Sequence, residues 1–67
     1  MKKFNPADLE VGVLYADNDV VTVLRFDEET TLYNFTEMEY DEERQDYIPT
    51  SNSIRLVKME VERLHKI

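Results

Sequence analysis

Short apolar runs, rich in β-branched and aromatic residues, alternate with polar segments along the chain. They recur about every 8–12 residues, which is the spacing typical of a small all-β domain. The pattern predicts strands at 11–15, 20–26, 31–40 and 46–50. Polar segments at Asp17-Asn18-Asp19 and at 27–30 are expected to form turns, because short Asp and Asn side chains bond their own backbone. The run 20–26 is apolar on both faces and should lie in the centre of a sheet.

The predicted turn at 27–30, taken as a four-residue hairpin loop, sets a register between the second and third strands. The expected pairs are Phe26 with Thr31, Leu24 with Tyr33, Thr22 with Phe35 and Val20 with Glu37. In this register, four large apolar side chains share one buried face: Leu24, Phe26, Tyr33 and Phe35.

Further along the third strand, the apolar positions change parity. Tyr33 and Phe35 are odd, whereas Met38 and Tyr40 are even. Such a change requires a bulge or sharp bend, here expected near Thr36-Glu37. A loop over 42–45 would then place Tyr40 opposite Tyr47 and Asp41 opposite Asp46.

The C-terminal segment 54–66 fits two structures. Residues 57–62 alternate between apolar and charged, as a half-buried strand does. Ile54, Val57, Val61 and Leu64 also recur at helical spacing, with Ser53 as an N-cap. The segment is therefore expected to be either a strand or a helix packed on the sheet.

One stretch carries a family resemblance. Tyr47-Ile48-Pro49-Thr50-Ser51-Asn52-Ser53-Ile54 resembles the part of Src-homology-3 domains in which an aromatic–aliphatic–proline run leads through a short 3₁₀ turn into the final strand. The resemblance implies a small barrel topology. It implies nothing about peptide binding, because the chain has no tryptophan to form a groove for proline-rich ligands.

These patterns together predict a mainly β fold, a small four- to five-stranded bent antiparallel sheet or barrel. Residues 1–67 should form a single small acidic domain, whose core is marginal because so short a chain buries only about 60% of its unfolded surface. Without cysteine no disulfide can reinforce it. The expected core residues are Val11, Val13, Val20, Leu24, Phe26, Leu32, Tyr33, Phe35, Met38, Ile48, Ile54, Val57 and Val61.

Negative charge is concentrated in the middle of the chain. The window 27–46 has nine acidic residues and a single base, Arg44, giving −8 where the whole chain carries −7. A field of one sign repels nucleic acid and acidic membranes and attracts basic protein surfaces. The candidate partner-binding residues are Asp27, Glu28, Glu29, Glu37, Glu39, Asp41, Glu42, Glu43 and Asp46.

The sequence offers no recognisable machinery for catalysis, cofactors or metals. His65 is the single histidine, and a lone histidine near a chain end is usually solvated. Asp17-Asn18-Asp19 starts like a calcium loop, but Thr22 stands where that loop needs glycine. The chain also lacks a glycine-rich loop for nucleotide phosphates. We therefore expect a protein that is not an enzyme, with no catalytic, cofactor-binding or metal-binding residues.

The acidic window is either a solvated face that keeps the protein soluble or a recognition surface. Alternate residues Glu37, Glu39 and Asp41 would project about 6.6–6.8 Å apart along one side of a strand. Phosphates in one DNA strand have a similar spacing, so the row could occupy a basic channel of a nucleic-acid enzyme. Small acidic inhibitors encoded by bacteriophages use this strategy. The favoured function is thus a binding module whose hairpin 27–46 docks on a basic partner surface.

Two other functions remain open. The protein could be a scaffold that self-associates through β edges or its apolar C-terminal segment, with charge serving solubility alone. It could also bind nucleic acid through Arg55, Lys58, Arg63 and Lys66, although the favoured function involves no direct nucleic-acid contact. No apolar run reaches the 18 or so residues of a membrane span. The expected location is a cytoplasm, bacterial or of an infected host cell.

Overall fold

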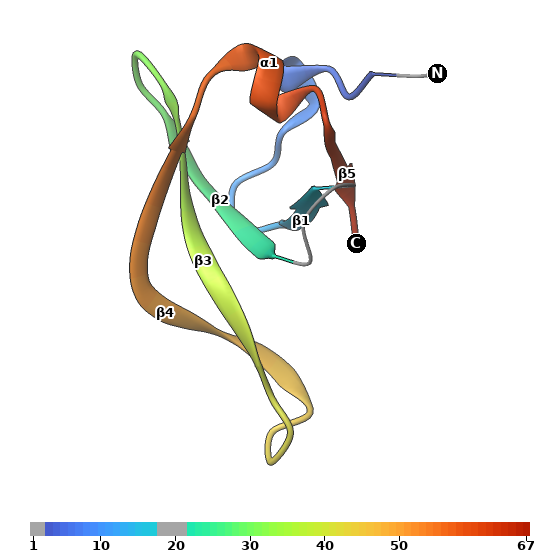
Figure 1. Cartoon of the computed structure of the whole chain (residues 1–67), viewed down its shortest axis with the longest axis vertical. Helices are drawn as coiled ribbons and strands as arrows, with labels where there is room; N and C mark the ends of the chain where they lie inside the picture. The colour runs from blue at the N-terminus through green and yellow to red at the C-terminus, as the bar shows by residue number, and fades with distance from the viewer. Residues whose placement is uncertain (1–2, 18–21) are drawn as a thin grey trace.

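Five antiparallel strands form one sheet in the order β4-β3-β2-β1-β5 (Figure 1). The computed structural model describes residues 3–17 and 22–67. The elements are η1 (Pro6–Asp8), β1 (Leu14–Asp17), β2 (Val23–Glu29), β3 (Tyr33–Asp41), β4 (Asp46–Leu56), α1 (Lys58–Val61) and β5 (Leu64–Lys66). The prediction of a mainly β fold with a four- to five-stranded antiparallel sheet is confirmed, with five strands. The sheet does not close into a barrel, because β4 and β5 remain its two edges.

The first two strands are displaced from their predicted positions. β1 begins at Leu14 rather than residue 11, because Val11 and Gly12 form a turn in which Gly12 adopts a φ of 85°. The Gly12 N–H donates to the Phe26 carbonyl across 2.8 Å, which ties this turn to β2. β2 continues to Glu29, three residues past the predicted end. The predicted turn residues Asn18 and Asp19, with Val20, lie outside the described residues.

The predicted register between the second and third strands is wrong. Phe26 pairs with Phe35 rather than Thr31, and Leu24 pairs with Glu37 rather than Tyr33. The error arises because residues 27–29 belong to β2, with a bulge between Phe26 and Glu28, and the turn lies at 30–32. In that turn the Thr30 N–H donates to the Leu32 carbonyl across 2.8 Å. The shared face was predicted correctly, since Leu24, Phe26 and Phe35 are buried together and Tyr33 packs against them.

The pairing of β3 with β4 follows the prediction more closely. Tyr40 lies opposite Tyr47 and Asp41 opposite Asp46, joined by a turn over 42–45. The register shifts between Thr36 and Met38, where a bulge was expected. Its extra residues, however, are in β4, where 50–52 face Glu37 alone. β4 continues unbroken to Leu56, so the 3₁₀ turn implied by the Src-homology-3 resemblance is absent from this stretch.

The C-terminal segment divides into short pieces rather than forming one strand or one helix. Ser53 and Ile54 belong to β4, so Ser53 is not a helix N-cap. The helix α1 is a single turn that begins after Val57, whose N–H donates to the Glu60 carboxylate across 3.0 Å. The predicted strand over 57–62 is therefore wrong. After α1 the chain turns back and β5 pairs with β1, with His65 opposite Ala16.

The core lies between the sheet and α1. Its buried side chains are Tyr15, Leu24, Phe26, Phe35, Val61 and Leu64. Tyr15 and Leu64 were not predicted; they are buried because β1 and β5 pair, a contact between the two ends of the chain. Val11 and Val57, both predicted as core, are exposed at 73% and 48%. Both stand in connecting segments where the chain turns away from the sheet.

The hairpin of β3 and β4 extends away from the rest of the sheet (Figure 1). β2 pairs with β3 as far as Met38, and in the described part of the chain only β4 pairs with β3 beyond it. We call residues 39–48 the distal hairpin. This projection makes the molecule elongated, with extents of 34 × 27 × 18 Å. No described helix has the length and apolar character required to cross a bilayer.

Candidate protein-binding surface

The fold separates the nine predicted partner-binding residues into two groups. Three belong to the end of β2 next to the 30–32 turn: Asp27, Glu28 and Glu29. Six lie on the distal half of the β3–β4 hairpin: Glu37, Glu39, Asp41, Glu42, Glu43 and Asp46. We call these six the distal carboxylates. Because the two groups flank opposite ends of β3, they do not form one continuous surface.

Asp27 is held within the protein rather than presented to a partner. Its carboxylate pairs with Arg25 Nε across 3.0 Å and accepts a 2.6 Å hydrogen bond from the Thr36 hydroxyl. Arg25 and Thr36 are cross-strand partners on the face opposite to Phe26 and Phe35. Asp27 therefore lies on the other side of the sheet from Glu37, while Glu28 and Glu29 are exposed beside the turn.

Among the distal carboxylates, Glu37, Glu39 and Asp41 form a row along one side of β3. They continue the side of the strand on which Phe35 is buried, since side chains alternate along a strand. Asp46 lies opposite Asp41, and Glu42 and Glu43 occupy the turn that joins the strands. The row therefore runs from the edge of the core to the tip of the distal hairpin.

Little positive charge balances this set. Arg44 Nε lies 3.6 Å from Asp41 Oδ2, but the Arg44 side chain is 74% exposed. Across residues 3–17 and 22–67, no other base forms an ion pair with a distal carboxylate. Six acids and one arginine give this part of the molecule a formal charge of −5. Such a field attracts cationic surfaces before contact and weakens as salt increases.

The distal hairpin has a second, aromatic face. Tyr40 and Tyr47 pair across the strands with ring centroids 5.2 Å apart and planes inclined at 73°. Two residues along each strand, Met38 and Pro49 form another cross-strand pair on the same face as the tyrosines. Val23 of β2 pairs with Met38 from the other side. Tyr40 is 49% exposed, so part of its ring faces solvent. The hairpin is thus acidic on one side and aromatic on the other.

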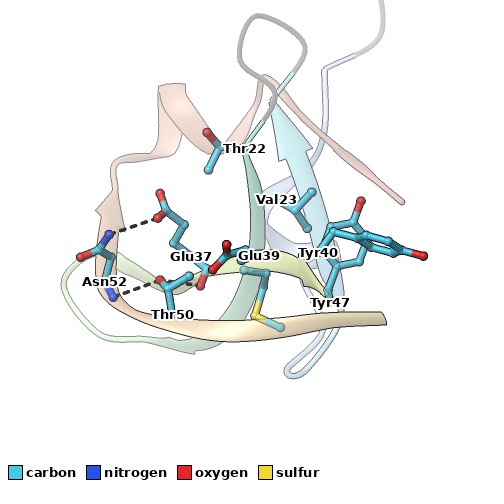
Figure 2. A pocket seen from close by; sticks show the side chains of 9 residues that line it. Thr22, Val23, Glu37, Glu39, Tyr40, Tyr47, Thr50 and Asn52 are labelled. Atoms are coloured by element: carbon cyan, nitrogen blue, oxygen red, sulfur yellow. Dashed lines mark hydrogen bonds between the residues drawn. The ribbon is translucent and has the colours of Figure 1, made fainter. Parts of the chain in front are cut away.

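A hollow of about 650 Å³ lies beside these residues and is open to solvent. Figure 2 shows Glu37 and Asn52 on one side of it, Val23, Tyr40 and Tyr47 on the other, and Glu39 between them. We call it the hairpin hollow. Its lining residues are Thr22, Val23, Glu37, Met38, Glu39, Tyr40, Tyr47, Thr50 and Asn52.

Exposed bases lie on other elements. Arg55 is near the end of β4, Lys58 begins α1, and Lys66 belongs to β5, with Arg63 between the last two elements. Lys66 Nζ is 3.2 Å from a Glu10 carboxylate oxygen, so its charge is partly balanced. The negative field is therefore concentrated at the distal hairpin, and four of the eight bases lie after it, between residues 55 and 66.

The side chains that could bind a metal or transfer a proton, His65 and the carboxylates, do not gather at one site among the described residues. No three His, Cys, Asp or Glu side chains there come together as metal ligands would. His65 is exposed on the edge strand β5. Comparison of the chain with protein-family models, with curated proteins and with solved structures finds no match.

Proposed function

We propose that this protein is a non-enzymatic binding module whose distal hairpin docks on a basic surface of a partner protein. The observation that supports this most is the net formal charge of −4 on the two-stranded projection 39–48, which contains five acids and one exposed arginine. Charge complementarity of this kind accelerates encounter and excludes partners of the same sign. Asp27, Glu28 and Glu29, at the other end of β3, contribute only to the long-range field.

The proposed partner surface is one that otherwise binds a nucleic-acid backbone. The row Glu37, Glu39 and Asp41 follows one side of a strand, so its carboxylates recur about every 6.6–6.8 Å. This spacing approaches that of phosphates in one nucleic-acid strand, and the row would take their place in a basic channel. Such an inhibitor or modulator would act in the cytoplasm of a bacterium or of an infected cell.

Affinity capture with matched variants tests the proposal. The immobilised protein is exposed to bacterial lysate at low salt and eluted with rising salt. The distal variant carries Glu39→Gln, Glu42→Gln and Glu43→Gln. The control variant carries Asp8→Asn, Glu28→Gln and Glu29→Gln. All six positions are exposed, and each variant removes three negative charges.

A partner bound through the distal hairpin should be retained by the wild-type and control proteins and lost from the distal variant. After purification it should bind the wild-type protein in competition with a short DNA duplex. Equal losses from both variants would instead indicate non-specific charge attraction and contradict the proposal. A partner that duplex DNA does not displace would contradict the proposed substitution for nucleic acid.

A second function, self-association as a scaffold, is favoured by the open edges of the sheet. β4 is an eleven-residue edge strand, and unpaired edges can recruit another chain. Apolar side chains are also exposed around the start of α1, with Met59 exposed at 70% and Val57, just before the helix, at 48%. Against this, β4 contains Pro49 and the irregular stretch 50–52, which interrupt the pairing that a second strand would need.

A further inference from the structure

β4 bends sharply between its two halves, where the distal hairpin leaves the rest of the sheet (Figure 1). Along β4, regular pairing with β3 ends at Ser53 and resumes at Pro49. The residues between them, 50–52, face Glu37 alone. A strand with extra residues bends and twists locally, and its ladder of backbone hydrogen bonds is disrupted there. The direction of the distal hairpin is therefore set at this irregular stretch.

Packing in the core does not fix the direction of the distal hairpin. Among the described residues, neither the buried core nor the side chains packed against it include any member of 39–48. β2 pairs with β3 only as far as Met38, so the described part of the hairpin beyond it is a ribbon of two strands. Such ribbons are marginally stable in water by themselves. A fixed angle between hairpin and sheet therefore requires contacts at the irregular stretch.

Two side chains of β4 make such contacts with Glu37 (Figure 2). The Thr50 hydroxyl donates to the Glu37 carbonyl across 3.0 Å, and Asn52 Nδ2 donates to Glu37 Oε1 across 3.1 Å. The Thr50 hydroxyl also accepts a 3.2 Å hydrogen bond from the Asn52 N–H, which joins the two donors. Glu37 is thus held by its main chain and by its side chain. We call Thr50 and Asn52 the Glu37 clamp.

We propose that the Glu37 clamp holds the distal hairpin at a fixed angle to the sheet, so that Thr50 and Asn52 are positioning residues. Thr50 contributes more, because its acceptor is a half-buried main-chain carbonyl, whereas the contact of Asn52 is exposed and competes with water. The role of the clamp in docking rests on the proposed function: a fixed hairpin presents the distal carboxylates in one arrangement and loses less entropy on binding. The angle itself is measured without a partner.

Residual dipolar couplings and backbone amide relaxation of the full chain measure the direction and order of the hairpin. In the wild-type protein, one orientation should fit the couplings of 39–48 and of the core strands, with order parameters of about 0.85 in both. Thr50→Val keeps the shape of the side chain and removes the hydroxyl. In this variant the couplings of 39–48 should shrink and their order parameters should fall towards about 0.6, while the core strands stay unchanged.

Three further variants separate positioning from general stabilisation. Thr50→Ser returns the donor and should restore the wild-type couplings. Asn52→Ala should loosen the hairpin less than Thr50→Val does, because the bond it removes is exposed. Ser51→Ala changes an exposed side chain of the same stretch and should leave the direction of the hairpin unchanged. The amide spectrum of each variant reports its folding, and Asn52→Ala takes the place of Thr50→Val if the latter does not fold.

Unchanged couplings over 39–48 in folded Thr50→Val would overturn the inference. It would also be overturned if the variant lost stability without a change in hairpin direction, because the hydroxyl would then be merely stabilising. Loosening by Thr50→Ser as large as that by Thr50→Val would exclude the hydroxyl as the cause.

Affinity capture from lysate tests the role of the clamp in docking. Thr50→Val retains every charge, so weaker binding of the partner, by about fivefold, would report the direction of the hairpin rather than its field. Equal binding by a variant whose hairpin is loose would overturn this role, although docking by charge would survive. If the wild-type protein retains no partner, the proposed function fails, and the couplings still decide whether the clamp exists.

Discussion

At the scale of single residues, Asp27 shows how context changes the role of a carboxylate. By its neighbours in sequence it belongs to a polar turn. In the structure it stands in β2 and joins Arg25 and Thr36 in a network on the outer face of the sheet. Arg25 reaches Asp27 through Nε and the Thr36 hydroxyl through an Nη atom, across 3.0 and 3.3 Å. The network thus joins β2 to β3 beside the bulge.

Asp27→Ala should lower the free energy of unfolding by about 1 kcal/mol, because it removes a charge-assisted hydrogen bond and an ion pair whose side chains are 34% and 33% exposed. Urea denaturation followed by circular dichroism measures the change. Glu28→Ala is the control, since Glu28 is the exposed neighbour and should change stability by less than about 0.5 kcal/mol. Equal effects of the two substitutions would show that the network adds nothing.

At the scale of elements, α1 depends on the sheet for its stability. A helix of four residues cannot persist alone, because helix nucleation is unfavourable and so few hydrogen bonds follow. Val61 is fully buried in the core, whereas Met59 on the same turn is largely exposed. Burial of Val61, the Val57–Glu60 hydrogen bond and the bond from the Phe4 N–H to the Glu62 carbonyl therefore hold this turn in place, and β5 follows it to pair with β1.

Val61→Ala should lower the free energy of unfolding by about 2 kcal/mol, from two lost methyl groups and the cavity they leave. Met59→Ala removes a larger side chain from the same helix but should cost less than about 0.5 kcal/mol. Chemical denaturation of both variants gives the comparison. A larger loss for Met59→Ala would show that α1 buries its other face, against another copy of the chain.

At the scale of the whole molecule, the most negative segment of the chain is also the part that projects farthest from the sheet. The distal hairpin carries a formal −4, or −5 when the adjacent Glu37 is included, and projects from the sheet, whereas the core lies with α1 and β5 at the other end. A projecting charged ribbon can enter a channel that a flat acidic face could not. The separation also means that substitutions in the distal hairpin should leave the core intact.

The protein should sediment as a single chain of 8.0 kDa at both low and high salt. The physical reason is that Pro49, the irregular stretch 50–52 and the shortness of β5 protect both sheet edges. Sedimentation equilibrium provides the measurement. A dimer that persists at high salt and dissociates with Val57→Asp or Met59→Asp would favour the scaffold function over the proposed binding module.

Local pattern was enough to predict the fold class and several turns. Alternation and β-branched residues marked the strands, and the polar run at 42–45 marked the turn that brings Tyr40 opposite Tyr47. The shared face of Leu24, Phe26 and Phe35 was predicted correctly from a register that proved wrong, because the predicted and observed pairings differ by an even number of residues. These features depend on neighbours in sequence, because side chains alternate along a strand wherever that strand pairs.

Register, closure and the grouping of charges were decided only by tertiary structure. One bulge after Phe26 moved Asp27 into an internal network, and pairing of β1 with β5 buried Tyr15 and Leu64. The sequence by itself determined that the chain is acidic, mainly β and most negative over 27–46. Which six acids form the distal carboxylates depended on pairing between distant segments, and a single bulge can change such pairing without altering the local pattern.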